Sequence, residues 1–360
     1  MEFFKLKLKD NDLAGVLVSL IESVKKVSTA IRSAGSKSSG VAGTSNASGE
    51  EQLKLDVLSD KIVQEELRKN TNIGLIASEE LEDEVVLGDG EYAVAYDPLD
   101  GSSLVDVNLA VGSIFGIYKL SGNVGGSKGN SGSGSGDSSE SSGGGKKSFV
   151  GMKGDDQVAA VIAVYGPKTT VIMATKDEDG VSEFTLGADG EFYLSRENLK
   201  VSEGKMFAPG NLRACKDNPK YLELANYWMK EEYTLRYSGG MVPDVAQILL
   251  KGKGIFSYPS CAKYPNGKLR LLFECAPMAM IMEKAGGAAS AGVVSGDVMM
   301  SGVGDVAEDA TVCEKGGILN TDDGFGVARI LDLKVESVHQ RTPIFIGSRG
   351  EVERCIKYLF

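Results

Sequence analysis

Acidic residues follow an apolar run in the first third of the chain, and small residues come directly after them. Asp97 and Asp100 lie three residues apart, and Gly101, Ser102 and Ser103 follow at once. Carboxylate oxygens are the ligands that hard cations such as Mg²⁺ prefer. Small residues with accessible backbone amides suit a phosphate group. The stretch therefore predicts metal-assisted phosphate chemistry.

Two apolar runs are expected to place such acids at the ends of neighbouring strands. Tyr92–Tyr96 is predicted to be a buried strand that ends at Pro98, because proline lacks the backbone donor that a central strand needs. The run Asn72–Ala77 is followed in the same way by Glu79 and Glu80. Four carboxylates in one crevice repel one another unless cations neutralise them. This arrangement strengthens the prediction of a metal site.

A second group of chemically useful residues lies in the C-terminal half. The apolar run Leu269–Glu274 is expected to be a strand that ends in a carboxylate. Lys268 and Arg270 stand at alternate positions with Glu274, so the three would share one strand face. Other cations and phenols of this half are Arg236, Tyr237 and Tyr258. Each alone is more often a surface cation or a half-buried tyrosine, but together they predict a basic, aromatic pocket for a second phosphate.

These residues together predict a phosphoric monoester hydrolase that uses metal ions and an activated water. About two or three Mg²⁺ ions, with Mn²⁺ as a substitute, would neutralise the scissile phosphate and lower the pKa of a bound water. The expected ligands are the carboxylates of Glu79, Asp97, Asp100 and Glu274 and the carbonyl oxygen of Leu99. Asp56, which shares a helix face with Asp60, and Glu80 would accept the proton of the water. A solvated helix face is the alternative interpretation for Asp56 and Asp60.

The composition bounds the class of protein. The 360 residues are 42% apolar and 25% charged, which is typical of a globular protein with one large domain or two ordinary ones. A net charge of −11 argues against nucleic-acid binding, because a phosphate backbone needs a basic footprint. No apolar run approaches the ~20 residues of a membrane span, and no targeting segment is evident. A cytoplasmic protein is therefore expected, with a plastid or another organelle as the open alternative.

Cysteine and histidine offer little to the expected chemistry. The five cysteines are scattered singly, which is typical of free thiols in a reducing compartment. His339 is the single histidine, so neither a His-rich zinc site nor a Ser-His-Asp triad is expected. A packed or surface position is the ordinary expectation for His339, and a catalytic role is the alternative.

Hydrophobic periodicity predicts strands that alternate with helices, and hence a layered α/β or α+β architecture. The expected helices are Asp12–Arg32, Glu50–Arg68, Pro219–Lys230, Pro243–Lys251, Pro277–Ala285 and Glu351–Phe360. The other expected strands are Leu109–Leu120, Val158–Tyr165, Thr169–Thr175, Gly254–Tyr258, Pro343–Gly347 and a hairpin that turns at Asp189-Gly190. Three Gly-rich stretches are expected to be irregular: a loop at 33–49, a disordered insertion at 121–147 and a surface excursion at 288–334. A boundary near Val201 would divide the chain into subdomains 1–200 and 201–360.

Several longer motifs carry a resemblance to a known family. DPLDGSS, SEE, KLDVLSD and NGKLRLLFECAPMAMIMEKAGG resemble the fructose-1,6-bisphosphatase family of sugar bisphosphatases. DPLDGSS alone is also similar to the inositol-monophosphatase relatives, whereas the last run is far more specific. The resemblance covers nearly the whole chain apart from two of the Gly-rich stretches. It implies a layered α-β-α-β-α sandwich with two subdomains, and hydrolysis of a sugar bisphosphate.

Within that family the chain is similar to the branch of sedoheptulose-1,7-bisphosphatases. The similar segments are GDDQVAAVIAVYGPKTT, KMFAPGNLRAC and YTLRYSGGMVPDV. Ala208-Pro209-Gly210 stands where fructose-bisphosphatases usually have Asn-Glu-Gly, which removes a donor to the distal phosphate. The branch implies hydrolysis of the 1-phosphate of sedoheptulose 1,7-bisphosphate to sedoheptulose 7-phosphate. YPNGKLRLLFEC and VHQRTPIFIG instead resemble fructose-bisphosphatases, so fructose 1,6-bisphosphate, or both sugars, is the alternative.

The resemblance also implies a role for each matching residue. It gives metal ligation to Glu79, Asp97, Leu99, Asp100 and Glu274, and water activation to Asp56 and Glu80. It gives the phosphate loop to Gly101, Ser102 and Ser103. It gives the distal phosphate and the sugar to Asn211, Arg236, Tyr237, Tyr258, Lys268 and Arg270. In the family the residue that matches Arg236 reaches in from a neighbouring subunit, which implies a homodimer or homotetramer.

Two further expectations concern regulation and a non-enzymatic alternative. Plastid sedoheptulose-bisphosphatases carry a redox cysteine pair in the loop that matches 40–48, and this chain has no cysteine there, so thioredoxin control at that site is not expected. A non-catalytic sugar-phosphate sensor is the remaining alternative. The intact set of acids argues against it, because a pure phosphate binder has no use for so many carboxylates.

Deleting the insertion at 121–147 is expected to leave kcat unchanged. A segment of Gly, Ser and Asn buries too little apolar surface to form part of a site. Steady-state kinetics with a sugar bisphosphate measures the effect. A collapse of kcat would show instead that the insertion folds over the site.

Overall fold

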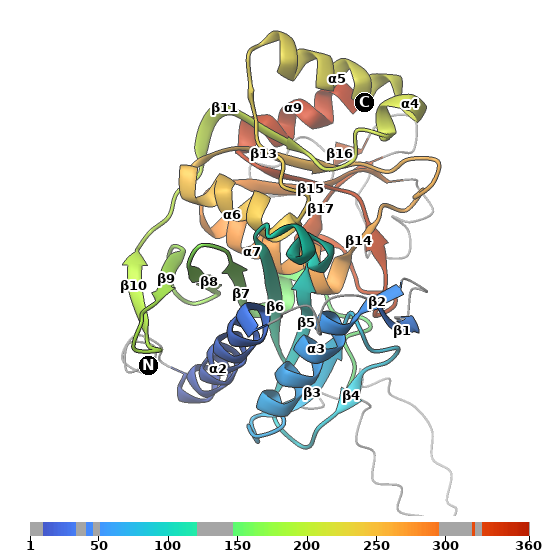
Figure 1. Ribbon diagram of the computed structural model, residues 1–360. Helices are drawn as coiled ribbons and strands as arrows, with labels where there is room; N and C mark the ends of the chain where they lie inside the picture. Colours follow the sequence, from blue (N-terminus) through green and yellow to red (C-terminus); the bar gives the residue numbers. More distant parts are fainter. Residues whose placement is uncertain are drawn as a thin grey trace, which may run out of the picture.

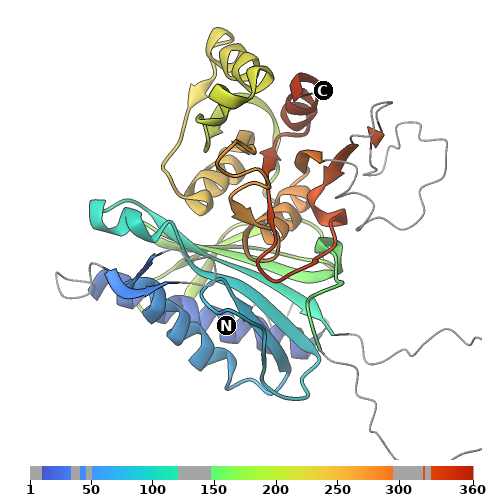
Figure 2. The same ribbon diagram turned by 90° about the vertical axis from the view of Figure 1, so that its right-hand side faces the viewer.

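The structure is a computed structural model that describes residues 10–33, 41–45, 51–120, 147–294, 319–320 and 326–359. Helices and sheets alternate in layers, with an eight-stranded and a seven-stranded sheet each lying between helices (Figure 1). Figure 2 shows the same layers after a quarter turn. The predicted layered α-β-α-β-α sandwich of the α+β class is confirmed.

The first layer is a pair of helices, α2 (Asn11–Ser33) and α3 (Lys54–Leu67). Apolar side chains recur on α2 every three or four residues, and those of Val16 and Leu20 are fully buried. They pack on one face of the eight-stranded sheet (Figure 2). The predicted helix over Asp12–Arg32 is therefore confirmed.

The predicted loop at 33–49 is wrong in its described part. Val41–Ser45 forms strand β1, which pairs antiparallel with β2 (Glu51–Leu53). Helix α3 therefore begins at Lys54 and not at Glu50. A short hairpin of this kind is held by backbone hydrogen bonds, so its side chains need not show the alternating pattern by which a strand is recognised.

The eight-stranded sheet has the strand order β10-β9-β8-β7-β6-β5-β3-β4. Its strands are β3 (Ile73–Ser78), β4 (Val85–Val86), β5 (Tyr92–Asp100), β6 (Val111–Lys119), β7 (Gln157–Tyr165), β8 (Thr169–Thr175), β9 (Ser182–Leu186) and β10 (Phe192–Arg196). Only the neighbours β3 and β5 run parallel in this sheet. Side chains alternate, so that Tyr96 packs with the α2 and α3 layer whereas Ala95 packs on the opposite face. The predicted hairpin at Asp189-Gly190 is confirmed, as are the strands expected over β6, β7 and β8.

Strand β5 continues past Pro98, so the prediction that it ends at this proline is wrong. Asp97 pairs with Ile114 and Asp100 pairs with Gly112, which places an extra residue on β5 relative to β6. Such a bulge lets proline, which lacks an N–H group, lie within a strand. Both acids therefore lie on the strand itself.

The third layer consists of α6 (Met241–Lys251) and α7 (Ala276–Lys284), which lie between the two sheets (Figure 1). Every side chain from Ala276 to Met282 is buried, so α7 is apolar on all sides. Helix α6 begins two residues before Pro243, so this proline lies inside the first turn rather than at its start. The two predicted helices are otherwise confirmed.

The seven-stranded sheet has the strand order β12-β11-β13-β19-β15-β17-β16. Its strands are β11 (Ser202–Pro209), β12 (Thr234–Leu235), β13 (Lys253–Tyr258), β15 (Ala288–Val294), β16 (Leu319–Asn320), β17 (Gly326–Arg329) and β19 (Ile344–Gly347). All of them follow Arg196, where the last strand of the first sheet ends. The predicted strands over β13 and β19 are confirmed, and a subdomain boundary near Val201 stays a prediction.

The prediction that 288–334 is a surface excursion is wrong in its described parts. Strand β15 lies between β19 and β17, where it packs between α7 and α9 (Arg349–Leu359). Its residues Ala289 and Ala291 are buried. Alanine and glycine carry a weak hydrophobic signal, although small side chains are what a strand closely covered on both faces needs. Residues 295–318 and 321–325 lie outside the described residues.

The insertion at 121–147 also lies outside the described residues, apart from its last residue. The ammonium of Lys147 donates hydrogen bonds to the carbonyl oxygens of Gly88 at 2.8 Å and Gly90 at 3.2 Å. A deletion that tests the insertion should therefore end at residue 146.

The fifth layer holds α9 together with α4 (Ala214–Asp217) and α5 (Pro219–Lys230). Trp228 is fully buried there, and its Nε1 donates to the carboxylate of Glu351 at 3.3 Å. Tyr233 donates to the same buried carboxylate at 2.6 Å, so the acid is satisfied by hydrogen bonds. The predicted helix over α5 and the C-terminal helix are confirmed. Among the described helices, none combines the length and apolarity that crossing a membrane requires.

The predicted strand Leu269–Glu274 is wrong beyond Arg270. Strand β14 (Leu269–Arg270) pairs with β18 (Arg341–Thr342), and the chain then forms a π-helical turn over Leu271–Cys275 that leads into α7. Periodicity cannot separate a buried strand from a buried helix in so short an apolar run. Lys268, Arg270 and Glu274 therefore do not share one strand face.

Replacing Leu20 by alanine is expected to lower the free energy of unfolding by about 3 kcal/mol. Leu20 is fully buried against the first sheet. The matched change Leu222→Ala, at a side chain that is 43% exposed, is expected to cost less than about 0.5 kcal/mol. Urea unfolding followed by far-UV circular dichroism measures both. Equal losses would contradict the packing described for α2.

Candidate active site

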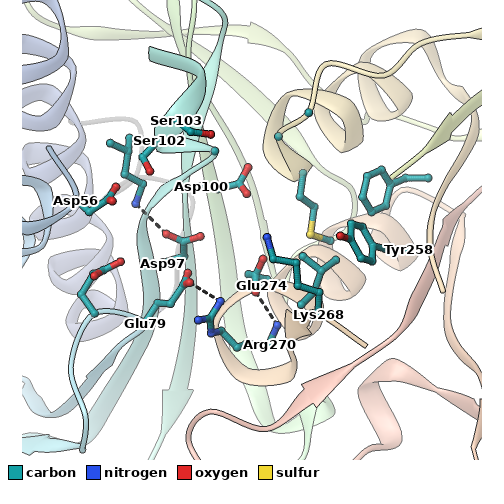
Figure 3. A pocket seen from close by; sticks show the side chains of 18 of the residues that line it. Asp56, Glu79, Asp97, Asp100, Ser102, Ser103, Tyr258, Lys268, Arg270 and Glu274 are labelled. Atoms are coloured by element: carbon teal, nitrogen blue, oxygen red, sulfur yellow. Dashed lines mark hydrogen bonds and ion pairs between the residues drawn. The ribbon is translucent and has the colours of Figure 1, made fainter. Parts of the chain in front are cut away.

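A cavity of about 310 Å³ lies where the ends of β3 and β5 meet the second half of the chain (Figure 3). The predicted site residues that line it are Asp56, Glu79, Glu80, Asp97, Leu99, Asp100, Gly101, Ser102, Ser103, Tyr237, Tyr258, Lys268, Arg270 and Glu274. Two predicted residues, Asn211 and Arg236, do not line it.

The parallel pairing of β3 and β5 brings the first acids together. Ser78 is the register partner of Tyr96, so the residues that follow each of them emerge at the same edge of the sheet. Glu79 and Asp97 therefore lie side by side in the cavity (Figure 3). The strand-end pattern of the sequence predicts this arrangement.

Three carboxylates meet in the acidic part of the cavity. The side chains of Asp97, Asp100 and Glu274 are buried, and each offers an oxygen within 4.8 Å of the other two. Burial and the neighbouring carboxylates raise the pKa of Asp97 well above its ordinary value. Burial is also the main cause that raises the pKa of Asp100 to about 6 and that of Glu274 to about 8. Clustered oxygens that resist ionisation without a counter-charge fit a divalent cation.

The π-helical turn explains how Glu274 reaches this cluster. The backbone N–H of Arg270 donates to Glu274 Oε2 at 2.6 Å, a bond between residues four apart that the turn makes possible. The side chain is thereby directed back toward β5 rather than along α7 (Figure 3). Single π-helical turns are frequent at functional sites because they re-aim a side chain without ending the helix.

Arg270 forms an ion pair with one of the carboxylates of the cavity. Its side chain is buried, and Nη1 lies 2.5 Å from Glu79 Oε1 (Figure 3). This ion pair crosses from the second half to the first and offsets part of the negative charge. The resemblance gives Arg270 to the distal phosphate and sugar, whereas the structure places its guanidinium beside the acids.

Asp100 also joins the two halves. Its Oδ2 accepts a hydrogen bond from the backbone N–H of Val242 at 2.7 Å, so it caps the beginning of α6. Gly239, Gly240, Met241 and Phe256 line the cavity as well, and the sequence interpretation missed them. The Gly-Gly pair before the predicted helix at Pro243 is the one signal that points to a close approach of backbone there.

The small residues after Asp100 form a tight turn into a short 3₁₀ helix, η1 (Ser102–Val107). Gly101 has φ of 74°, which a residue with a side chain rarely adopts. A Cβ on Gly101 would also lie 3.3 Å from the Cα of Gly240. Glycine therefore lets Ser102 and Ser103 lie at the edge of the acidic cluster (Figure 3).

Asp56 and Asp60 are both buried, so the solvated alternative is wrong for each. Asp56, in the first turn of α3, lines the cavity (Figure 3). Asp60 instead accepts hydrogen bonds from Ser78 Oγ at 2.7 Å and from Tyr96 Oη at 3.0 Å. Asp60 therefore connects α3 to the two strands that carry the acids, whereas Asp56 faces the cavity.

Phenols and an ammonium group line the opposite end of the cavity. Lys268 and Tyr258 lie across from Asp56 and Glu79 (Figure 3). Burial raises the pKa of Tyr258 to about 12, so its hydroxyl keeps its proton and can donate. Tyr237 donates to the carbonyl oxygen of Gly210 at 3.2 Å. The cavity is therefore acidic at one end and rich in donors at the other.

The two predicted residues outside the cavity have other contacts. Asn211 is buried, and its Nδ2 donates to the carbonyl oxygen of Pro259 at 3.0 Å. This bond stabilises the turn that follows Tyr258. Arg236 is exposed, and its Nη1 donates to the carbonyl oxygen of Leu235.

Two family models match the chain. The model described as fructose-1-6-bisphosphatase, N-terminal domain, matches residues 3–197, and the model of the C-terminal domain matches residues 201–313. The chain belongs to the fructose-1,6-bisphosphatase family. The resemblance read from the motifs is confirmed by this membership.

Relatives named for two different sugars match at similar identity. The chloroplastic sedoheptulose-1,7-bisphosphatase of Spinacia oleracea is 36% identical over 100% of this chain and 77% of its own length. The class 1 fructose-1,6-bisphosphatase of Citrifermentans bemidjiense is 40% identical over 97% of this chain and 88% of its own length. The crystal structure of Leishmania major fructose-1,6-bisphosphatase in holo form has a TM-score of 0.79 and 31% identity, with 99% of this chain and 97% of that chain covered. Sugar bisphosphatases are phosphoric monoester hydrolases, so the predicted enzyme class is confirmed.

The buried carboxylates are expected to make stability depend on pH and on a divalent cation. Their pKa values are raised in the folded state, so the folded protein binds more protons than the unfolded chain between about pH 4 and about pH 8. In the presence of a chelator, stability should therefore fall as the pH rises through this window. Mg²⁺ should raise the melting temperature more at pH 8.5 than at pH 6.

Thermal unfolding followed by circular dichroism at each pH measures both effects. Asp97→Asn is the matched variant, because it removes one of the repelling charges and one cation ligand together. A Mg²⁺ effect that shrinks with rising pH would contradict the assignment of these acids as ligands.

Proposed function

We propose that the chain is a Mg²⁺-dependent phosphatase that hydrolyses the 1-phosphate of sedoheptulose 1,7-bisphosphate to give sedoheptulose 7-phosphate. The polarity of the cavity supports this most, because carboxylates gather at one end and Tyr258 lies at the other, with Lys268 between them (Figure 3). A sugar bisphosphate has two anionic ends. One end suits the donors directly, and the other suits the carboxylates only through cations.

The acidic end fits Mg²⁺ by the chemistry of its donors. The carboxylates of Glu79, Asp97, Asp100 and Glu274 and the carbonyl oxygen of Leu99 would hold the ions, as hard oxygen ligands do. Bound Mg²⁺ would neutralise the scissile phosphate and lower the pKa of the attacking water. The raised pKa values of three of these acids support the assignment, because such a cluster lacks a sufficient counter-charge of its own.

Residues of the first half carry out the proton transfer and hold the scissile phosphate. Asp56 and Glu80 reach the acidic end from α3 and from the turn after β3, and they take the proton from the water. The turn of Gly101–Ser103 orients the phosphate. The water oxygen forms a bond to phosphorus while the bond from phosphorus to the sugar oxygen breaks, and the sugar oxygen leaves with the electron pair and takes up a proton.

Residues of the second half hold the phosphate that is not cleaved. Lys268 supplies a positive charge, and the protonated hydroxyl of Tyr258 supplies a donor. Tyr237 lies on the same wall. These contacts would hold one phosphate of the substrate away from the carboxylates while the other phosphate reaches them.

The turn Ala208–Gly210, which contacts Tyr237 and Tyr258, supports the seven-carbon sugar as the substrate. Ala208 and Pro209 end β11 as buried residues, so this turn offers no side-chain amide to the distal phosphate. A Cβ on Gly210 would lie 2.6 Å from the ring of Tyr258, so the glycine lets the ring pack against the turn. The match to the Spinacia oleracea relative over the whole chain adds to this support.

Fructose 1,6-bisphosphate is the second candidate substrate. The relative from Citrifermentans bemidjiense, named for that activity, is 40% identical. The structure from Leishmania major, named for the same activity, shares the fold over nearly the whole chain. Hydrolysis of both sugars by one site is included in this candidate.

Steady-state kinetics on the two bisphosphates test the proposal. At saturating Mg²⁺, kcat/KM for sedoheptulose 1,7-bisphosphate should exceed that for fructose 1,6-bisphosphate by at least about tenfold. The reverse order would establish the second candidate. Absence of Mg²⁺-dependent phosphate release from either sugar would overturn the enzymatic proposal and favour a sensor.

The position of Arg236 supports a homodimer or homotetramer. This residue does not line the cavity of its own chain, and its side chain is exposed. It is therefore free to complete the donor end of a neighbouring subunit's cavity. Light scattering on the purified protein measures the mass, and a monomer at the enzyme's working concentration would contradict the proposal.

Asp97→Asn and Glu274→Gln are each expected to lower kcat by at least about 100-fold. Each change removes an expected cation ligand and keeps the shape of the side chain. Folding should be retained, because each change also relieves repulsion within the buried cluster. The control Asp106→Asn removes an exposed carboxylate of η1 that does not line the cavity. Turnover near that of the unaltered protein in either variant at saturating Mg²⁺ would contradict the assigned roles.

A further inference from the structure

The segment around His339 connects the two carboxylate-bearing turns of the site. On one side it belongs to the second half, where the carbonyl oxygen of Gln340 accepts a hydrogen bond from the N–H of Leu271 at 2.8 Å. Leu271 is the first residue of the π-helical turn that carries Glu274. The residues that follow, in β18, pair with β14 at the entrance to the same turn. The segment is therefore fixed to the turn by backbone hydrogen bonds.

On its other side the segment reaches the first half through the side chain of His339. Nε2 lies 2.8 Å from the carbonyl oxygen of Leu81, a residue 258 positions away in the chain. A carbonyl oxygen can only accept a hydrogen bond, so Nε2 is the donor in this contact. The ring also packs against Phe273, with 5.4 Å between the ring centroids.

The other ring nitrogen indicates why a histidine is present. Nδ1 is buried and has no hydrogen-bond partner among the described residues. A buried ring nitrogen without a hydrogen-bond partner lowers the stability of the fold. A phenylalanine would fill the same space without this loss of stability. Packing alone therefore does not explain His339, and the hydrogen bond to Leu81 is what the imidazole adds.

Leu81 closes the turn that carries Glu79 and Glu80. The first half holds the start of this turn, because the N–H of Glu79 donates to the carbonyl oxygen of Tyr96 at 3.0 Å and the N–H of Glu80 donates to Ser78 Oγ at 3.2 Å. His339 holds its end from the second half. The two glutamates thus lie between an anchor on their own sheet and an anchor on the segment that positions Glu274.

We propose that His339 is a positioning residue that sets the water-activating Glu80 and its neighbour Glu79 at the correct distance from Glu274. The proposal rests on the function proposed above for these three acids. Their reaction needs groups from both halves of the chain to be aligned closely, and a displacement of about 1 Å in such a site can cost roughly a hundredfold in rate.

Paired substitutions test the role. His339→Phe keeps the packing on Phe273 and removes the donor to Leu81. It should lower kcat roughly ten- to hundredfold and raise the Mg²⁺ concentration needed for half-maximal rate. KM for the bisphosphate should change little, since Tyr258 and Lys268 lie on the other wall. His339→Gln retains an N–H donor of similar reach and should recover much of kcat.

The outcomes separate this inference from the proposed function. An active unaltered protein whose His339→Phe variant keeps kcat and the Mg²⁺ requirement would overturn the inference alone. Equal losses in both variants with a lowered melting temperature would show a packing role and would also overturn it. An unaltered protein that is inactive on both sugars would instead be a failure of the proposed function.

A spectroscopic measurement needs no variant. Because the chain has one histidine, ¹⁵N-histidine labelling gives a single pair of ring nitrogen signals. Nε2 should appear as a nitrogen that carries a hydrogen, and its signal should shift when Mg²⁺ and inorganic phosphate are added. An Nε2 without a hydrogen, or signals that do not respond to either addition, would contradict the proposal.

Discussion

Repulsion among buried carboxylates is the constraint on which the rest of this structure depends. Asp97 and Asp100 come from β5, Glu79 follows β3, and Glu274 comes from the second half. Two of them are held by a group from the other half: Arg270 pairs with Glu79, and the N–H of Val242 donates to Asp100. The acids can therefore lie together only when the two sheets are assembled around them. The same repulsion favours binding of a cation by such a cluster, because a bound cation removes an unfavourable interaction as well as forming favourable ones.

The acids at the ends of β3 and β5 could be predicted, because the pattern of neighbouring residues in the sequence indicates where each strand ends. Two apolar runs that each end in acids place Glu79 and Asp97 at one sheet edge if the strands are parallel neighbours, and β3 and β5 are. The cavity residues of the second half could not be predicted in the same way, because their positions depend on contacts between distant parts of the chain. Glu274 faces the cluster because of a π-helical turn, and the same six letters are equally compatible with a strand. Strand β15 was beyond prediction for a related reason, since Ala289 and Ala291 give a weak signal and become core residues only between two helices.

The carboxylates and the phenols of the cavity are separated in space. The carboxylates of Asp97, Asp100 and Glu274 gather at one end of the cavity. Tyr237 and Tyr258 lie at the other end, where both contact the turn that contains Gly210. Relatives named for six-carbon and seven-carbon sugars match the chain almost equally well. Overall identity is therefore a poor guide to the substrate.

The orientation of Glu274 depends on the number of residues in the π-helical turn at Leu271–Cys275. A π turn contains one residue more than the α-helical turn it replaces, and its hydrogen bonds are less favourable. Loss of a single residue there would let α7 continue backward as a regular helix and would rotate Glu274 by about 100°. The backbone would gain stability while the cluster lost a carboxylate. The π-helical turn is less stable than a regular helical turn, but it directs Glu274 toward the other carboxylates. Local stability and the arrangement of the cluster therefore conflict in this turn.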